Sequence, residues 1–340
     1  MSAKPRLLAL PDKFRGTASA TQIADAIVRA AAASGWAAEA VPVSDGGEGL
    51  LDCFGGANRR TEVSGPLGSP VRAAWRLQEQ RAVVEMAAAS GLGLVAGHND
   101  PLAASTTGTG QLVAAAIDAG ARHVVVGAGG SATTDGGLGA VDVLRRYGPL
   151  DGSHGYQVVV AADVSTTFLD APHLFAPQKG ADSGQVAHLA ARLRALAVDY
   201  RTEFGVDVTA LDGAGAAGGL AGGLAALGAR IRPGFDLVAD ELGLRGRISG
   251  ADLVVTGEGL LDHTSFLGKA PGAVLRMCSE LGTPVVLVVG DIAADVCSPV
   301  ATVALLPTFG ADAALRDTLR CVETAVTTML AARRAGPRQS

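Results

Sequence analysis

The stretch GAGGSATTDGGLGA, residues 127–140, directly follows the β-branched run HVVV and leads into an apolar helical segment. It combines six glycines with three hydroxyl side chains and one carboxylate, Asp135. A buried strand, a glycine-rich turn and a helix in this order are typical of an α/β protein with parallel strands. Such a turn can bind an anion, or it can only redirect the chain.

The rest of the chain repeats this strand–loop–helix order. Strands are predicted near both ends of the chain, at residues 6–10, 37–43, 251–259, 284–291 and 302–308. Three more are predicted in the middle, at 82–87, 123–128 and 157–163, with helices near 108–120, 136–147 and 184–204. A last helix is expected over about 311–334. The alternation predicts an α/β fold built on parallel sheets.

Two arrangements of these elements are open: one large sheet, or a domain made from both chain ends with a second domain inserted. The segments VSGPLGSP (63–70) and ARIRPGF (229–235) resemble paired crossings between domains and favour the insertion. We therefore expect a discontinuous domain from 1–63 and 233–340, and an inserted α/β domain from 64–232. The small-residue run GAGAAGGLAGGLAALG (213–228) predicts very close packing against a neighbouring element.

Composition excludes several classes of protein. The 340 residues are 48% hydrophobic and 18% charged, with a formal net charge of −5 and no basic stripe of the kind that binds nucleic acid. No apolar run approaches the length that spans a bilayer, and the N-terminus does not resemble a signal peptide. The four cysteines lack CxxC spacing, so free thiols in a reducing compartment are expected. These features predict a soluble, cytoplasmic protein.

Acidic residues gather in the loops that follow predicted strands. The loops PDKFRGT, SDGGEG, VTGEGLLDHTSFLGK and VGDI contribute Asp12, Asp45, Glu258, Asp262 and Asp291. In open α/β sheets, loops at the carboxyl ends of the strands form the ligand crevice. Purely structural loops need glycine and at most one capping side chain. So many acids beside glycines favour a metal–nucleotide or proton-transfer site.

The opening stretch can bind phosphate through backbone N–H groups and the hydroxyls of Ser131, Thr133 and Thr134. The alternative for Asp135 is a helix cap, in which its carboxylate accepts free N–H groups of the next helix. The segment STTGTGQ (105–111), with Thr107 and Gly108, leaves the same choice open between cap and anion cradle.

Phosphate-binding cations must come from outside any Walker loop, because the chain contains no GK[ST] sequence. Lys179 and Lys269 each lie beside a glycine and can neutralise phosphate, although a solvated surface lysine is the alternative. Lys13 and Arg15 lie in the first strand–helix loop, where a carboxylate or phosphate can be held. The histidines lack the spacing of a zinc site, and GAGAAG (213–218) follows no strand, which argues against dinucleotide binding there.

Taken together and in order, these motifs resemble the bacterial glycerate kinase family, in its first type, which has no P-loop. The resemblance covers about residues 6–310 and rests on the segments PDKFRGT, PVSDGGEG, GPLGSPV, VVEMAAASGL, TTGTGQLVAAAIDAGARHVVVGAGGSATTDGG, PQKGA, GAGAAGGLAGGL, RPGFDLV and ADLVVTGEGLLDHTSFLGKAP. It implies two α/β domains around a cleft, one of them flavodoxin-like and discontinuous. It also implies transfer of the γ-phosphoryl group of ATP, with Mg²⁺, to D-glycerate, most often giving 2-phosphoglycerate.

The chain departs from the family pattern in three places. The connection over 147–157 is short, and the segment AADVSTTFLDAP keeps Asp163 but lacks the family's Asn-Pro-Leu. Lys13-Phe14-Arg15 replaces the common Ser-Phe-Lys and so preserves a cation. The first two departures lie in the expected inserted domain, so they bear on the acceptor more than on the nucleotide chemistry. A different small hydroxy acid or a natural-product intermediate is the alternative acceptor.

Within this resemblance, each candidate residue receives an expected role. Asp45 is expected to act as base or to orient the acceptor hydroxyl, and Lys13 and Arg15 to hold the substrate carboxylate. Mg²⁺ is expected at Asp135 and Asp262. Nucleotide binding is expected at Gly129, Gly130, Ser131, Thr133, Thr134, Thr107, Gly108, Lys179, Lys269 and Glu258. The protein is expected to be a monomer or homodimer. A non-catalytic nucleotide or metabolite sensor is the second hypothesis, and a dehydrogenase a weaker third.

Overall fold

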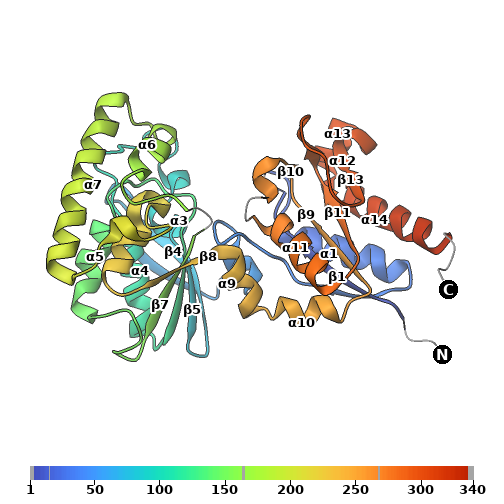
Figure 1. The fold of residues 1–340 in the computed structure, drawn as a ribbon, viewed down its shortest axis with the longest axis horizontal. Helices are drawn as coiled ribbons and strands as arrows, with labels where there is room; N and C mark the ends of the chain where they lie inside the picture. The colour runs from blue at the N-terminus through green and yellow to red at the C-terminus, as the bar shows by residue number, and fades with distance from the viewer. Residues whose placement is uncertain (1–3, 15, 163–164, 267–268, 336–340) are drawn as a thin grey trace. The chain divides into compact units, whose positions relative to one another are not determined.

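The computed structural model describes residues 4–14, 16–162, 165–266 and 269–335 (Figure 1). The chain divides into two compact units, the first from residues 1–44 and 238–340 and the second from 45–237. The first unit is therefore assembled from both ends of the chain. The boundaries expected at 63/64 and 232/233 stay a prediction about domains. None of the helices in the described ranges is long and apolar enough to cross a membrane.

The first unit contains a five-stranded, fully parallel sheet in the order β2-β1-β9-β11-β13. Counted along this unit alone, the order is 2-1-3-4-5, which is the flavodoxin-like arrangement. The strands are β1 (Arg6–Pro11), β2 (Ala37–Ala40), β9 (Leu253–Gly257), β11 (Val285–Val289) and β13 (Thr302–Ala304). A short parallel pair, β10 (Leu260–Leu261) and β12 (Asp291–Ile292), follows β9 and β11. The α/β fold class expected from the sequence is confirmed.

Helices cover the strands of this sheet because their apolar faces must be buried. Helix α1 (Ala20–Ala33) begins at a capping box formed by Ser19 and Gln22 and packs with α14 (Thr318–Ala335) over β1, β9 and β11. The other helices of this unit are α10 (Leu244–Ser249), η6 (His263–Phe266), α11 (Ala270–Leu281), α12 (Leu305–Phe309) and α13 (Ala311–Arg316), and α9 (Gly234–Glu241) runs across the division between the units. The single helix expected over 311–334 is wrong, because α13 ends before Asp317 and α14 begins after it.

The second unit contains a six-stranded mixed sheet in the order β3-β4-β5-β6-β7-β8. Strands β5 (Arg81–Glu85), β6 (His123–Gly127), β7 (Gln157–Ala162) and β8 (Arg230–Pro233) are parallel. Strands β3 (Arg59–Ser64) and β4 (Pro70–Gln78) extend this sheet as antiparallel neighbours. The run Val124–Val126 and the matching valines of β5 and β7 are buried on both faces, as central parallel strands require.

The helical segments of the second unit are mostly short. They are α2 (Leu50–Cys53), α3 (Ala87–Ser90), η1 (Leu92–Val95), α4 (Thr107–Asp118), α5 (Leu138–Leu144), η2 (Arg145–Tyr147), α6 (Ala171–Phe175), η3 (Pro177–Lys179), α7 (Ser183–Phe204), η4 (Val208–Ala210), η5 (Ala216–Gly219) and α8 (Leu220–Ala226). The close packing expected of residues 213–228 is confirmed. A Cβ on Gly219 would lie 2.7 Å from the Cα of Gly136, and one on Gly223 would lie 2.7 Å from the carbonyl oxygen of Gly136. Only glycine permits these backbones to approach so closely.

Candidate active site

The first unit brings acidic loops together at the point where its strand order reverses. Strand β1 is followed by Asp12 and Lys13, and the adjacent strand β9 is followed by Glu258. The N–H of Asp12 donates to the carbonyl of Gly257 at 2.9 Å, which joins the two loops. In open parallel sheets, a ligand crevice lies at the carboxyl ends of such neighbouring strands. Arg15, expected to act with Lys13, lies outside the described residues.

Glu258 is the most perturbed carboxyl group of this region. Its side chain is only 9% exposed, and its Oε1 atom has no hydrogen-bond partner among the described residues. Burial, with smaller contributions from the carboxylates of Asp12 and Asp262, raises the pKa of Glu258 to about 7. The Ser265 hydroxyl and the Lys269 ammonium oppose this shift. A buried oxygen without a protein partner, in a polar loop cluster, can accept a cation or a hydrogen bond from a ligand.

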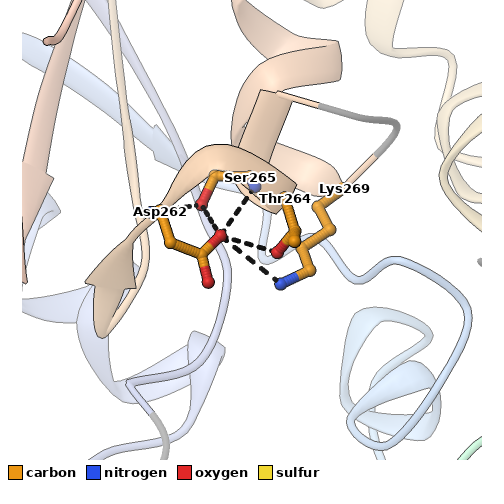
Figure 2. Close-up of polar contacts among 4 residues, drawn as sticks. All are labelled: Asp262, Thr264, Ser265 and Lys269. Carbon is orange, nitrogen blue, oxygen red and sulfur yellow. Dashed lines mark hydrogen bonds and ion pairs between the residues drawn. The ribbon is translucent and has the colours of Figure 1, made fainter. Parts of the chain in front are cut away.

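Asp262 lies beside Glu258 and is held in one orientation by the turn that follows it (Figure 2). Its Oδ1 atom accepts the hydroxyl of Thr264 at 2.6 Å and the N–H of Ser265 at 3.0 Å, and Lys269 Nζ lies 4.0 Å away. The Thr264 bond is the main reason that the pKa of Asp262 is lowered. All these contacts involve Oδ1, while Oδ2 points away from them (Figure 2). Asp262 thus presents an ionised, oriented oxygen.

We call Asp12, Glu258, Asp262, Ser265 and Lys269 the acidic loop cluster. Lys269 is one-third exposed and lies at the N-cap of α11, where helix N–H groups also favour anions. Ser265 is fully buried, and it was not among the residues expected from the sequence. Its position three residues after Asp262, typical of a capped turn, was the available signal.

The second unit places the Asp45 loop directly on its central parallel strands. A Cβ on Gly46 would lie 2.5 Å from the Cα of Gly234, and a Cβ on Gly129 would lie 2.7 Å from the Cα of Gly47. These glycines are therefore required by backbone contact between loops. Asp45 accepts the N–H of Gly47 at 3.2 Å and remains half-buried beside the Gly129 loop.

The loop Gly127–Ser131 has an exposed rim and a buried continuation. Gly130 is exposed with a φ of +67°, and Gly129 is half-buried. Thr133 and Thr134 have no exposed surface, and neither hydroxyl has a hydrogen-bond partner among the described residues. Phosphate binding by these two hydroxyls stays a prediction, and the structure places them behind the rim that Gly129 and Gly130 form.

Asp135 is buried and joins the starts of two helices. Its Oδ2 atom accepts the N–H and the hydroxyl of Thr106, both at 2.8 Å, beside the first turn of α4. Its carboxylate also accepts the N–H groups of Gly137 at 3.0 Å and Gly139 at 3.3 Å at the start of α5. Gly137 is the N-cap residue of α5, and Asp135, two residues before it, accepts N–H groups at the start of that helix, as the cap alternative open at the sequence level requires. The expected metal role of Asp135 stays a prediction without supporting geometry.

The neighbouring residues Thr107 and Gly108 lie in the same helix junction. Thr107 is hydrogen-bonded to the Ser105 hydroxyl, and a Cβ on Gly108 would lie 1.8 Å from the carbonyl oxygen of Ser64. This glycine is thus explained by contact with β3, and its nucleotide role stays a prediction. Glu85, at the end of β5, was not expected; it accepts the N–H groups of Gly49 at 3.0 Å and Leu51 at 2.8 Å. A carboxylate that ends a buried strand was the available signal.

A match to a family model identifies the chain. The model of the glycerate kinase family matches residues 7–146 and 149–332. The chain belongs to the glycerate kinase family. It is therefore a kinase, which confirms the resemblance and the enzyme class expected from the sequence. The break at 147–148 falls at the start of the short 147–157 connection.

Named relatives and a solved structure agree with this membership. The chain is 35% identical over 329 residues to a glycerate 2-kinase of Escherichia coli K12, covering 86% of each chain. It is 35% identical to a glycerate kinase of Bacillus subtilis 168, covering 85% of this chain and 86% of that one. The crystal structure of a Salmonella typhimurium LT2 protein described as glycerate kinase 2 superposes with a TM-score of 0.84 at 31% identity, covering 98% of this chain and 99% of that one.

Proposed function

We propose that this kinase transfers the γ-phosphoryl group of ATP to a hydroxyl of D-glycerate, giving 2-phosphoglycerate. The family and the names of the relatives support glycerate as the acceptor. The observation that carries the phosphoryl chemistry is the acidic loop cluster, where oriented carboxylates and a lysine lie at the strand-order reversal. Phosphoryl transfer requires mainly positioning and charge neutralisation, and these residue types supply both.

The donor atoms of this cluster fit Mg²⁺. Asp262 Oδ2 is oriented and makes none of the contacts that hold Oδ1, and Glu258 Oε1 is a buried oxygen without a partner among the described residues. Mg²⁺ prefers oxygen ligands and keeps several waters, so one or two carboxylates are sufficient. We propose Asp262 and Glu258 as these ligands; no group of three metal-binding side chains lies together in the described part of the chain. Bound Mg²⁺ would neutralise charge on the phosphates.

The basic candidate residues of the first unit are proposed to bind and orient anions. We propose that the Lys269 ammonium, with the N-terminus of α11, binds nucleotide phosphate. In this assignment the Asp262 carboxylate, 4.0 Å from the Lys269 ammonium, helps to orient it. Lys13, and Arg15 beyond the described residues, are proposed to hold the acceptor carboxylate.

For the second unit, we propose that the N–H groups of the Gly129–Gly130 rim bind a phosphate-bearing substrate. Ser131, at the inner side of this rim and 9% exposed, can add its hydroxyl. Asp45 is proposed to accept a proton from the acceptor hydroxyl or to orient that hydroxyl. Its half-buried position and its bond from Gly47 hold the carboxylate in a defined orientation.

The test is a coupled assay of ADP release with ATP, Mg²⁺ and a panel of small hydroxy acids, with phosphorus NMR of the product. D-Glycerate is expected to give the highest kcat/KM, with the phosphate on the 2-hydroxyl. The absence of Asn-Pro-Leu after Asp163 favours a second candidate, a kinase for another hydroxy acid. If another hydroxy acid is phosphorylated and glycerate is not, that acid replaces D-glycerate as the proposed acceptor. If no acid causes ADP release, the sensor hypothesis is favoured. The cytoplasmic location and the monomeric or dimeric state stay predictions.

A further inference from the structure

Three consecutive carbonyl groups behind the glycine rim are each held by a different side chain. Asn99 Nδ2 donates to the carbonyl of Ala132 at 3.2 Å, and Lys179 Nζ donates to that of Thr133 at 2.6 Å. Arg192 Nη2 donates to the carbonyl of Thr134 at 2.8 Å. The three side chains come from a loop, from η3 and from α7, so segments far apart in the sequence hold one short stretch of backbone. We call Asn99, Lys179 and Arg192 the carbonyl clamp.

The clamp holds a backbone carbonyl with a buried charged group, which is unfavourable to bury. Lys179 is only 4% exposed, and burying an ammonium group is unfavourable unless it is well paired. Burial lowers the pKa of Lys179 to about 8, although the Asp135 carboxylate opposes the shift. A hydrogen bond from a charged donor is stronger than one from a neutral donor, which suits a residue that must restrain a backbone.

The surroundings of the clamp are not optimised for stability. Thr133 Oγ1, Thr134 Oγ1, Asn99 Oδ1 and Arg192 Nε are all buried without a hydrogen-bond partner among the described residues. Four such atoms around one loop are unusual, because most buried polar groups are paired. The chain therefore orients the carbonyls of residues 132–134 and leaves other polar atoms here unpaired. Polar groups left unpaired in this way are expected at functional sites.

The clamped carbonyls adjoin the Gly129–Gly130 rim along the chain. Each peptide plane is rigid, so fixing a carbonyl also fixes the N–H group of the next residue. Glycines in the rim add no side-chain restraint of their own, and Gly130 adopts a φ of +67°. Fixing the carbonyls of residues 132–134 therefore fixes the N–H groups of residues 133–135 and restrains the C-terminal end of the rim segment. The rim also has restraints of its own, because the Leu92 N–H donates to the Gly130 carbonyl at 2.8 Å and Gly129 packs against Gly47.

We propose that Asn99, Lys179 and Arg192 are positioning residues that hold the 132–134 backbone, and through it the Gly129–Ser131 segment, in the conformation that binds a phosphate-bearing substrate. This inference rests on the proposed function of the rim. It changes the role of Lys179, whose ammonium group was expected to contact phosphate directly. In the clamp, Lys179 acts through the Thr133 carbonyl.

The experiment compares Asn99→Asp, Lys179→Met and Arg192→Gln in the full-length enzyme. Each variant removes the donor group that holds the carbonyl: the amide N–H of Asn99, the ammonium of Lys179 or the guanidinium of Arg192. Asn99→Asp also removes the bond to the Lys179 carbonyl, and Arg192→Gln the bond to the Leu102 carbonyl. We expect kcat/KM for the nucleotide to fall about 10- to 100-fold in all three, the size of effect that misplacement of binding groups produces. We expect KM for the acceptor to change less than about twofold.

Lys179→Arg retains a donor and should restore part of the loss. Arg194→Gln, an exposed arginine on the same helix, is the matched control and should retain full activity.

Hydrogen exchange provides a readout that does not depend on turnover. Backbone amides of residues 129–135 should exchange faster in the three clamp variants, whereas amides of α1 and β9 should not change. Lys179→Met combined with Asn99→Asp should cost less than the sum of the single effects, because both act on one backbone segment.

Two results would overturn the proposal. One is a loss confined to Lys179→Met, which would return Lys179 to direct phosphate contact. The other is a lowered melting temperature with unchanged kinetic constants, which would make the clamp purely structural. If the wild-type enzyme releases no ADP with any acceptor, the proposed function fails. The exchange measurement still tests whether the clamp restrains the loop.

Discussion

The acidic loop cluster of the first unit and the glycine-rich loop of the second unit contain similar residue types, but their carboxylates differ in how many hydrogen bonds they accept from the protein. In the first unit, Glu258 keeps an oxygen without a partner among the described residues, and Asp262 directs one oxygen away from its own turn. In the second unit, Asp135 accepts four hydrogen bonds within the protein. We therefore propose that the Asp135 carboxylate, with its oxygens paired, holds structure, and that the unused oxygens of Glu258 and Asp262 bind a ligand.

This difference teaches that motif composition does not by itself separate binding from packing. Several glycines of the second unit are explained by backbone contact, as at Gly129 against Gly47 and Gly218 against the carbonyl of Thr133. Only the short rim at Gly129 and Gly130 remains accessible in the described part of this loop. Carboxylate substitutions in the two units should therefore differ in both the size and the kind of their effects.

The largest effect is expected at Asp45. Replacing it as Asp45→Asn removes the proposed proton acceptor and keeps the shape of the side chain. We expect kcat to fall by roughly 10²–10⁴-fold, the usual loss of a general base, while the dissociation constant for ATP stays unchanged. Steady-state kinetics and calorimetry of ATP binding measure the two quantities. Asp52→Asn, an exposed carboxylate on the adjacent helix α2, is the control. Near-normal turnover of Asp45→Asn would remove Asp45 from the chemistry.

The next effect tests the cap role of Asp135. Asp135→Ala leaves the N–H groups of Thr106, Gly137 and Gly139 without their acceptor in a buried junction. We expect the free energy of unfolding to fall by about 2–4 kcal/mol, because unpaired buried donors are costly. The Mg²⁺ concentration for half-maximal activity should not change in the folded fraction. Chemical denaturation and a Mg²⁺ titration check these outcomes. A raised Mg²⁺ requirement with unchanged stability would support the metal role instead.

The sequence was sufficient for the fold class, but it predicted neither strands β3, β4 and β8 nor which role Asp135 has. Runs such as HVVV and PVVLVV identify central strands because buried parallel strands are apolar throughout. The small-residue run at 213–228 predicts close packing because glycine lets backbones approach each other, and four of its glycines also adopt positive φ. Antiparallel β4 was not anticipated, since its pattern mixes arginines with half-buried positions.

The contacts that decide function join residues far apart in the chain. Asp135 binds Thr106, 29 residues away, and Lys179 reaches the Thr133 carbonyl, 46 residues away. Periodicity and local motifs carry no information about such pairs. The cap alternative for Asp135 followed from its place before a helix, whereas its bonds to α4 required the tertiary structure. Lys179 has the sequence context of a surface lysine beside glycine, and only burial shows otherwise.

At Asp262 we expect the opposite result to that at Asp135: a changed Mg²⁺ requirement with little change in stability. We expect Asp262→Asn to raise the Mg²⁺ concentration for half-maximal activity about tenfold, because one charged ligand is lost and neutral amide oxygens bind Mg²⁺ less well. Stability should change little, since the side chain is about one-third exposed. Asp295→Asn, an exposed carboxylate bonded to His263, serves as control. An unchanged Mg²⁺ titration in Asp262→Asn would exclude Asp262 as a ligand and reduce the contrast between the two units.

The smallest effect concerns the pH dependence of stability at Glu258. The pKa of Glu258 is about 7 in the folded protein, well above its ordinary value of 4.5. Between these two values the folded state retains a proton that the unfolded state has lost, so stability declines as pH rises from 4.5 to 7 and is then constant. Glu258→Gln does not titrate and removes this decline. With Mg²⁺ chelated, the variant should therefore be more stable than the wild type at about pH 8, and this difference should vanish towards about pH 4.5. Denaturation curves at several pH values measure it. A difference in stability that does not depend on pH would mean that folding does not raise the pKa of Glu258. The unpartnered oxygen of Glu258 would then no longer distinguish the first unit from the second.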